Sequence, residues 1–600
     1  MPDAAAKTAP MADLPRWDLE PLVSGGGDDA ARGFLAEAEA EAEEFAKTYR
    51  GKVEELDGEG LAEALAVLGG ISDRLGRAGS YAALGYSVDS DSHERGALLA
   101  ELQQRGAQIE TNLLFFELEW AQVGDERAAE VLASPALDLY RHFLEVARMQ
   151  KPHLMTEPEE KIATELRVTG RSAFARLFGD QISALRVDLP DRDEPVELDE
   201  ALAELQSPDR SRREAAAGSI TTTLEPGLKT RAYIFNTLLQ DKATMDRLRS
   251  YPSWISSRNL SNEASDESVQ ALVEAVTNRY EIARRWYRLK AKLLGVDQLA
   301  WYDRAAPVGG SEREVPYEEA KSTVLDCYRG FSPEMADTAA AFFDGNYVDV
   351  PPAAGKRGGA FCSYTVPSAH PYVMLNYTAK PNDVLTLAHE LGHGVHASLA
   401  RPRGIFEFTT PLTVAETAST FGESIVLDRL LDDAAREEKL SLLAETIDGY
   451  VATTFRQIAM NRFEDRVHTA RREEGEISTD RFASDWLATQ TDLLGDSVSL
   501  DEAYGIWWSY IPHFIDSPGY VYAYAYGNLL ALSVYRRYRE EGPDFVPAYL
   551  DLLKAGGSRS PEGLGEIVGV DLRDPEFWNK GLDLIEERLD EAEREAEVQG

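Results

Sequence analysis

The residues best suited to chemistry lie in one short segment, His389-Glu390-Leu391-Gly392-His393. On a helix, residues four apart lie on the same face about one turn apart, so both imidazoles can bind a single Zn²⁺ at about 2.0 to 2.1 Å. Glu390 projects about 100° around the helix, beside the metal, where a base for the water that zinc activates belongs. Chance places such a motif in roughly one chain in a hundred of this composition. The segment therefore predicts a hydrolytic site with one Zn²⁺ per chain.

The third ligand decides the class of zinc site. A metzincin needs Gly at position 396 and His at position 399, whereas this chain has His396 and Leu399. Glu416 follows in a predicted helix over Leu412–Glu423, and small residues around it allow that helix to approach the first closely. Two histidines and a glutamate leave the fourth position of zinc open for water. We therefore predict His389, His393 and Glu416 as the metal ligands.

Two further residues near this site have open roles. Glu423 lies on the same helical face as Glu416, two turns later. It either orients a liganding imidazole or is an ordinary surface or interhelical carboxylate. His396 has the same ambiguity between an orienting and a packing role.

A helix is predicted to carry the two histidines. Asn382 or Asp383 is the expected N-cap, and helical periodicity runs over Val384–Ala400. The apolar face of this helix consists of Val384, Ala388, Leu391 and Val395, opposite a stripe of His389, His393 and His396. A helix with these two faces is expected to be covered by protein on all sides.

A small β-hairpin is predicted immediately before this helix. Residues Ala360–Val366 and Pro371–Tyr377 are β-branched and aromatic, and the segment between them resembles a turn. The hairpin is positioned to bind a peptide substrate as an added strand, through main-chain hydrogen bonds that accept many side chains.

The rest of the chain predicts a mainly α protein. Helical periodicity recurs over Ala30–Tyr49, Leu61–Leu68 and Gly96–Val123, and again from Asp199 to Phe342. The polar, proline-containing stretch Leu189–Pro195 is the candidate boundary between domains. We expect an N-terminal helical domain over 1–195, with residues 1 to about 15 disordered, a catalytic domain over 196–590, and an acidic tail over 591–600.

Composition excludes several classes of function. The 600 residues carry 104 acidic and 62 basic side chains, a net charge of −42, which disfavours nucleic-acid partners because phosphate binding needs clustered Lys and Arg. No apolar stretch is long enough to span a membrane, and no signal peptide is evident. Two cysteines, Cys327 and Cys362, form no disulfide framework. We expect a cytoplasmic protein in a reducing compartment.

The motifs together resemble a known family, the zinc metallopeptidases that include thimet oligopeptidase and oligoendopeptidase F. The similarity is carried by Leu387–His396 and Ala415–Glu423, with further support from Lys356–Phe361, Pro152–Glu160 and the tyrosine-rich segment near the C-terminus. It runs from about Trp17 to Trp578 and is most specific over 356–424. The resemblance implies a helical ellipsoid with a deep substrate channel that holds the zinc. It also implies cleavage of internal bonds in short peptides.

The tyrosine-rich segment Ile511–Gly527 gains a role from this resemblance. In similar enzymes a histidine and two tyrosines downstream of the zinc site bind substrate and stabilise the oxyanion, which by position gives His513, Tyr520 and Tyr526. Strict alternation of tyrosines alone predicts a strand, whereas the family precedent implies a turn leading into a helix over Asn528–Arg537. Packing with a satisfied hydroxyl is an equal alternative for each tyrosine.

Two alternatives to a zinc endopeptidase stay open at this point. A related zinc carboxypeptidase would need a basic residue to receive the terminal carboxylate of the substrate. A non-catalytic helical protein that binds peptides would keep the metal for structure only. Nitrogen and oxygen ligands also accept cobalt or manganese, and the oligomeric state and the cleavage preference are not determined by the sequence.

Overall fold

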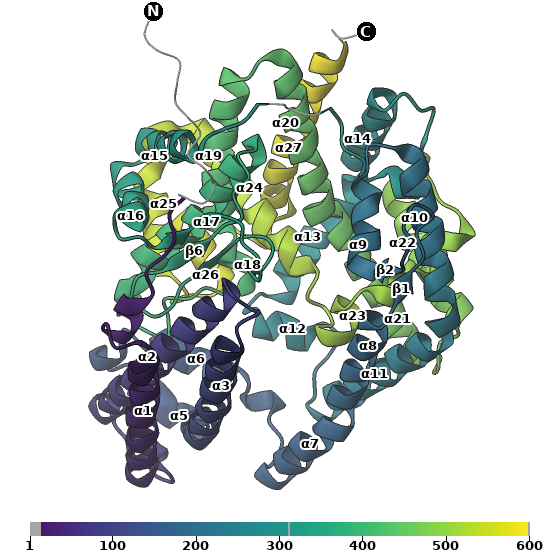
Figure 1. The fold of residues 1–600 in the computed structure, drawn as a ribbon. Coiled ribbons are helices and arrows are strands. Elements are labelled where there is room, and N and C mark those ends of the chain that lie inside the picture. The colour runs from purple at the N-terminus through teal and green to yellow at the C-terminus, as the bar shows by residue number, and fades with distance from the viewer. Residues whose placement is uncertain (1–13, 310–312, 598–600) are drawn as a thin grey trace, which may run out of the picture. The chain divides into compact units, whose positions relative to one another are not determined.

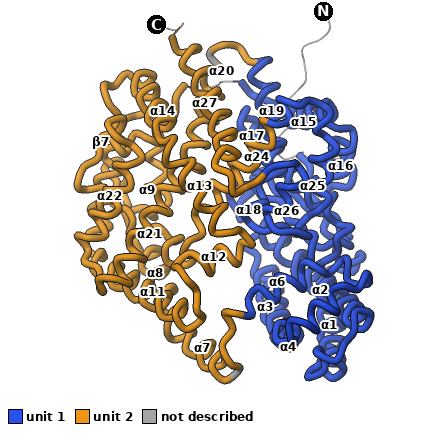
Figure 2. The backbone as a smooth tube through the Cα atoms, turned by 180° about the vertical axis from the view of Figure 1, so that it is seen from behind, with its two compact units in different colours: residues 1–151, 312–433, 537–570 blue, residues 152–311, 434–536, 571–600 orange. Residues whose placement is uncertain are grey.

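The computed structural model describes residues 14–309 and 313–597. Their backbone forms two compact units, each assembled from three stretches of chain (Figure 2). Unit 1 comprises residues 1–151, 312–433 and 537–570, and unit 2 comprises residues 152–311, 434–536 and 571–600. The helix α24 (Tyr522–Glu541) begins in unit 2 and ends in unit 1. Both units are mainly helical, which confirms the predicted fold class.

Unit 1 contains the helix with the two histidines and its neighbours. Its helices are α1 (Gly27–Tyr49), α2 (Gly58–Ser87), α3 (His93–Leu113), α4 (Phe115–Gln122), α5 (Asp125–Leu132), α6 (Arg141–Met149), α15 (Tyr317–Phe331), α16 (Pro333–Asp344), α17 (Pro381–Ala400), α18 (Leu412–Ala415), α19 (Thr417–Asp433), α25 (Val546–Ala555) and α26 (Pro561–Ile567). The predicted early helices are present with different bounds: α1 and α2 are longer than predicted, and the predicted helix Gly96–Val123 is divided into α3 and α4. Gly58 and Gly60 lie in the first turn of α2, because the Asp57 side chain caps that helix by accepting from the Gly60 N–H.

The predicted hairpin is present as part of a three-stranded sheet in unit 1. β5 (Phe361–Ser363) pairs antiparallel with β6 (Tyr372–Met374), and β6 pairs parallel with β4 (Val348–Asp349). The order β4-β6-β5 leaves β5 as an edge strand within the described residues. Both β5 and β6 pack against α17, which confirms a small sheet beside the histidine-bearing helix (Figure 1).

The start of α17 differs by two or three residues from the predicted cap. The helix begins at Pro381, a residue suited to the first helical position because its fixed φ is helical and its missing N–H has no partner there. The Asp383 carboxylate reaches back and accepts from the N–H groups of Lys380 at 3.0 Å and Thr378 at 2.7 Å. Lys380 is therefore the N-cap, and Asp383 stabilises the helix start from inside the first turn.

Unit 2 contains the tyrosine-rich segment. Its helices are α7 (Glu157–Thr169), α8 (Arg171–Ser183), α9 (Leu198–Ala203), α10 (Arg210–Leu224), α11 (Leu228–Leu248), α12 (Ser256–Ser261), α13 (Asp266–Asn278), α14 (Tyr280–Leu293), α20 (Arg436–Tyr450), α21 (Gln457–Glu473), α22 (Thr479–Leu494), α23 (His513–Asp516) and α27 (Pro575–Glu597). Its strands form two pairs, antiparallel β1 (Arg186–Val187) with β2 (Val196–Glu197), and parallel β3 (Leu299–Ala300) with β7 (Val498–Ser499).

The predicted domain boundaries stay predictions. Leu189–Pro195 lies in the connection between β1 and β2 within unit 2. The predicted acidic tail is helical as far as Glu597, as the last part of α27, and residues 598–600 lie outside the described residues. The predicted disorder of residues 1 to about 15 falls almost wholly outside them as well. Among the described helices, none combines the length and the apolar composition that crossing a bilayer requires.

Candidate metal centre

Three side chains of unit 1 converge on one point. His389 and His393 come from adjacent turns of α17, and Glu416 comes from the junction between α18 and α19. Glu416 Oε2 lies 3.2 Å from His389 Nε2 and 3.5 Å from His393 Nε2. One ligand atom from each of the three residues lies within 4.8 Å of the others. The sequence-predicted ligands are therefore brought together in one cluster.

His389 contacts a carboxylate on each side of its ring. Its Nδ1 lies 3.1 Å from Glu423 Oε2, while its Nε2 faces Glu416. Burial of the ring lowers its pKa, but the hydrogen bonds to these two glutamates outweigh burial, so the pKa lies well above its usual value. Glu423 thus takes the orienting position, since a hydrogen bond to one ring nitrogen fixes which nitrogen remains for a metal.

Glu416 interrupts the helix that the sequence predicts over Leu412–Glu423. Its backbone (φ −80°, ψ 0°) departs from α geometry and separates α18 from α19. The Ser419 hydroxyl donates to Glu416 Oε2 at 2.8 Å and holds the carboxylate toward α17. Burial raises the Glu416 pKa, but the hydrogen bonds from the two histidines outweigh burial, so the pKa lies well below its usual value.

The close approach of α17 and α19 depends on Gly392. A Cβ atom at this position would lie 2.5 Å from the carbonyl oxygen of Ala418 and 2.6 Å from the Cα of Ser419. Both distances are far inside van der Waals contact with backbone atoms that belong to α19. A glycine between the two histidines therefore lets Glu416 and Glu423 reach His389.

Glu390 lies beside the cluster and is not one of the three converging ligands. Its side chain is buried, with the residue 7% exposed, and the backbone N–H of Cys362 on β5 donates to its carboxylate. Burial raises the pKa of Glu390 above its usual value. A carboxylate with a raised pKa holds a proton more readily, which suits a group that accepts a proton and returns it.

A cavity of about 370 Å³ opens beside these residues. Its walls include Glu390, His393 and Glu416, and side chains from the β5 segment and from the loop before α18 complete them. The β5 residues on the wall are Phe361 and Cys362, followed by Tyr364 just after the strand. The cavity therefore places a catalytic-type carboxylate, two predicted metal ligands and a free strand edge around one space.

His396 lies outside the group of converging ligands. It is 1% exposed, and neither ring nitrogen has a hydrogen-bond partner among the described residues. Burial, followed by the charge of His393, lowers its pKa to about 3, so the ring is neutral. In this structure His396 packs in the interior of unit 1.

The tyrosine-rich segment forms a second cluster, in unit 2. His513 Nε2 and the Tyr524 hydroxyl are 3.2 Å apart and hydrogen bonded. The Tyr520 ring lies 6.1 Å from the His513 ring and 5.0 Å from the Tyr524 ring, measured between centroids. All three side chains are half-buried, so each has a face that a ligand can reach.

The other two tyrosines of this segment point into the core of unit 2. Tyr522 accepts a hydrogen bond from Asn262 Nδ2 at 2.9 Å, and the Tyr526 hydroxyl bonds with Ser268 Oγ at 3.3 Å. The Tyr526 ring packs 4.7 Å from Trp578. The alternation of tyrosines therefore reflects a helix rather than a strand, because α24 starts at Tyr522 and turns Tyr522 and Tyr526 to the same buried face.

Two residues near the candidate sites, Tyr524 and Tyr364, are not among the site residues predicted from the sequence. Tyr524 is hydrogen bonded to His513. Had the segment been predicted as a helix, Tyr524 would have been placed on a different face from Tyr522 and Tyr526. Tyr364 lines the cavity beside the metal ligands, but its direction follows from the way the chain leaves β5. No pattern in the sequence gives that direction.

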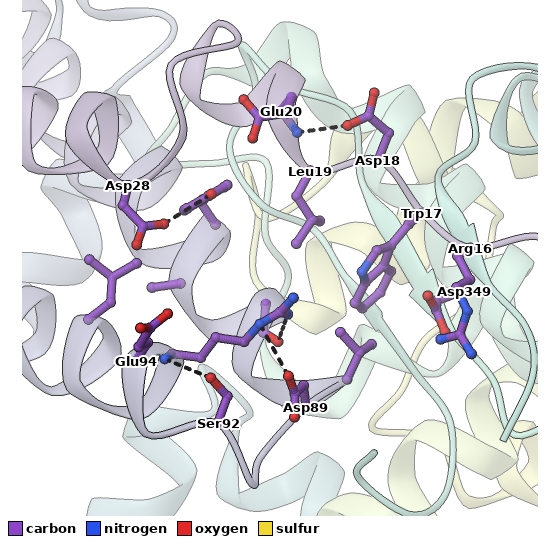
Figure 3. Close-up of a pocket in the computed structure, with 16 residues that line it drawn as sticks. Arg16, Trp17, Asp18, Leu19, Glu20, Asp28, Asp89, Ser92, Glu94 and Asp349 are labelled. Atoms are coloured by element: carbon purple, nitrogen blue, oxygen red, sulfur yellow. Dashed lines mark hydrogen bonds and ion pairs between the residues drawn. The ribbon is translucent and has the colours of Figure 1, made fainter. Parts of the chain in front are cut away.

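A larger cavity of unit 1, about 640 Å³, lies at the start of the described chain (Figure 3). Two of its acidic side chains, Asp28 and Asp18, already have partners. Asp28 accepts from the Tyr81 hydroxyl at 3.2 Å, and Asp18 accepts from the N–H of Glu20 at 3.0 Å. None of the metal-cluster residues lines this cavity.

The donor set of the cluster fits zinc. Two imidazole nitrogens and one carboxylate oxygen are the three protein ligands of many catalytic zinc sites, which keep a fourth position for water or substrate. A cation at this point would also replace the close contacts that the three side chains make with one another. The residues present therefore match the group that the sequence predicts.

Comparisons with known proteins agree with this arrangement. The family model described as peptidase family M3 matches residues 203–584, and the model described as oligopeptidase F matches residues 119–186. The oligopeptidase PepF of Bacillus subtilis is 27% identical over 553 residues, which cover 91% of this chain and 82% of that protein. The group B oligopeptidase PepB of Streptococcus agalactiae is 26% identical and covers 87% of this chain and 88% of its own length.

Solved structures show the same fold. A crystal structure from Chlamydophila abortus superposes with a TM-score of 0.86 at 24% identity, covering 98% of this chain and all of that one. The oligoendopeptidase F of Enterococcus faecium superposes with a TM-score of 0.71 at 22% identity, covering 95% and 99%. Since the first family model spans more than half of the residues and includes the histidine and glutamate cluster, this chain belongs to peptidase family M3 and is a metalloendopeptidase.

Proposed function

We propose that this protein is a zinc-dependent oligoendopeptidase that hydrolyses internal bonds of short peptides. The observation that supports it most is the convergence of His389, His393 and Glu416 within 4.8 Å, next to the buried carboxylate of Glu390. These three residues hold the metal, and Glu423 fixes the orientation of the His389 ring. When bound, zinc supplies Lewis acidity that polarises the scissile carbonyl and makes water more acidic.

Glu390 is the proton carrier of the proposed reaction. Its carboxylate takes the proton of the attacking water and later delivers it to the nitrogen of the departing amine. The N–H of Cys362 holds the carboxylate at the cavity wall, and burial raises the pKa of Glu390 above its usual value, which favours the return of the proton it accepts. The same residue can therefore act as base and then as acid.

The edge strand β5 is the proposed binding surface for the peptide main chain. Its Phe361 and Cys362 line the cavity, and its outer edge faces no other strand within the described residues. A peptide that adds to this edge is held by main-chain hydrogen bonds, so its side chains are only weakly selected. This mode of binding suits an enzyme that cleaves many different short peptides.

His513 and Tyr520 are the proposed donors to the oxyanion, and Tyr526 stays a third candidate. Burial, followed by the positive charge of Arg456, lowers the His513 pKa, so the ring is neutral near pH 7 and donates through its N–H. Tyr524 is added here because its hydroxyl bonds to His513 and fixes that ring. One such donor contributes about 3 to 4 kcal/mol to lowering the barrier.

A graded-length peptide library tests the proposal. The zinc-loaded protein is expected to cut internal bonds of peptides whose two ends are blocked, and a chelator should abolish cleavage until zinc is restored. Cleavage that requires a free carboxyl end would instead assign a carboxypeptidase. Peptide binding without any product would assign a non-catalytic protein. A cytoplasmic location stays part of the proposal, to be checked by cell fractionation.

A further inference from the structure

The hydroxyl group of Tyr364 is buried and has no hydrogen-bond partner among the described residues. A buried polar group normally has a partner, because leaving one unpaired is costly. Tyr364 directly follows the last residue of β5, and its ring lies 6.4 Å from those of His393 and Phe408. The phenol is therefore held against the candidate metal centre with its hydrogen-bonding capacity unused.

The two carboxylates that share the cavity with Tyr364 already have partners. The Glu390 carboxylate accepts from the N–H of Cys362, and Glu416 accepts from Ser419 and faces both histidines. The Tyr364 side chain nevertheless forms part of the wall of the same cavity of about 370 Å³. A ligand that fills this cavity is thus the natural source of the missing acceptor.

We infer that the Tyr364 hydroxyl donates a hydrogen bond to a main-chain carbonyl oxygen of the peptide in this cavity. A main-chain acceptor is favoured over a side chain because Tyr364 continues the free edge of β5, along which a peptide main chain would run. This inference rests on the proposed peptidase function. It adds a substrate-binding residue on unit 1, separate from the His513 cluster of unit 2.

The variant Tyr364→Phe removes this hydroxyl and keeps the ring. We expect kcat/KM to fall about three- to tenfold, the usual effect of one hydrogen bond between neutral groups. The factor should be similar for peptides that differ in their side chains, because the acceptor belongs to the main chain. The zinc content and the melting temperature should match those of the unchanged protein.

The matched control is Tyr317→Phe. Tyr317 also has a buried hydroxyl without a hydrogen-bond partner among the described residues, but it lies on α15 and does not line the cavity. Its loss should leave kcat/KM unchanged. An equal fall in both variants, or an unchanged kcat/KM for Tyr364→Phe, would overturn the inference, as would an effect confined to one peptide.

A binding measurement separates this inference from the proposed function. In the Glu390→Gln background, calorimetry compares the affinity of one end-blocked peptide with and without Tyr364→Phe. The peptide should bind about three- to tenfold more weakly without the hydroxyl. If the zinc-loaded wild-type protein cleaves no peptide, the proposed function fails, whereas equal peptide affinities in the two variants reject the role of Tyr364.

Discussion

Glu390 differs from the glutamates around it because its surroundings oppose its charge. Glu416 and Glu423 face imidazoles, whereas Glu390 is buried against the edge of β5 and receives one backbone N–H. Burial therefore dominates its electrostatics and raises its pKa. A residue in that state is suited to moving a proton rather than to holding a metal.

Replacing Glu390 with glutamine should separate catalysis from metal binding. Glutamine keeps the shape and can still accept from Cys362, but it takes no proton from water. We expect kcat to fall about 10²- to 10⁴-fold, with the zinc content of the protein unchanged by elemental analysis. Wild-type turnover in this variant would remove Glu390 from the proposed role.

A pair of substitutions distinguishes a metal ligand from a residue that orients one. Glu416→Ala removes a predicted ligand atom and should leave the purified protein without stoichiometric zinc. Glu423→Ala removes only the partner of His389 Nδ1, so zinc affinity should fall about 10- to 100-fold while binding persists. Zinc titration monitored by competition with a chromophoric chelator measures both. Equal affinities in the two variants would contradict the assignment.

At the scale of elements, the contact between α17 and α19 assembles the centre. Two histidines on one helix define a face, but the third ligand and the orienting carboxylate come from the next helices along the chain. The distance between these helices is set where Gly392 meets the backbone of Ala418 and Ser419. Any side chain there must separate the helices by a large fraction of an ångström.

The variant Gly392→Ala should therefore damage the centre and the fold together. We expect a loss of stability of about 1 to 3 kcal/mol from overpacking, together with weaker zinc binding. Gly33→Ala is a suitable control, because Gly33 lies within α1 and a Cβ there meets nothing within 4 Å. That control should gain up to about 1 kcal/mol from helix propensity. Chemical denaturation measures the free energy of unfolding of both variants. A Gly392→Ala variant with the stability and zinc affinity of the unchanged protein would show that this contact does not set the position of α19.

At the scale of the whole molecule, the net charge and a buried acid both make the stability of the protein depend on pH. The net charge of −42 creates self-repulsion that salt screens. Glu464, in the core of unit 2, is 0% exposed. It accepts from the N–H of Gly519 at 2.7 Å, and burial raises its pKa to about 8.

The pH dependence of unfolding should reveal Glu464. Because its pKa is higher in the folded than in the unfolded protein, the folded state binds the extra proton between about pH 4.5 and 8. Stability from this group is thus complete below that range, falls as pH rises through it, and is constant above it. Glu464→Gln should remove a decline on the order of a few kcal/mol, seen by denaturant unfolding at pH 5 and 9. Parallel pH profiles for the two proteins would reject the raised pKa.

Local sequence patterns were sufficient for the histidine-bearing helix, for the hairpin beside it and for the three residues that the fold brings together in one cluster. Periodicity identified the helix that carries His389 and His393, β-branched residues identified the hairpin beside it, and the spacing of the motif identified residues that converge with Glu416. Each of these features depends on residues close together in the chain, whose relative geometry the backbone fixes. The break at Glu416 escaped prediction because it depends on a single pair of dihedral angles.

The tertiary structure decided which residues far apart in the sequence contact one another and which are buried. Only the packing of α19 on α17 brings Glu423 to His389, and only the tertiary structure places the side chains of His396 and Tyr526 in the interior. The path of the chain after β5 aims Tyr364 at the metal cavity. Sequence periodicity gives the face of an element on which a residue lies, but the partner of that face is chosen by packing across the whole unit. For this reason the sequence by itself determined which residue types meet at the centre and at what spacing, while the burial and hydrogen bonds of each side chain were decided only by the folded protein.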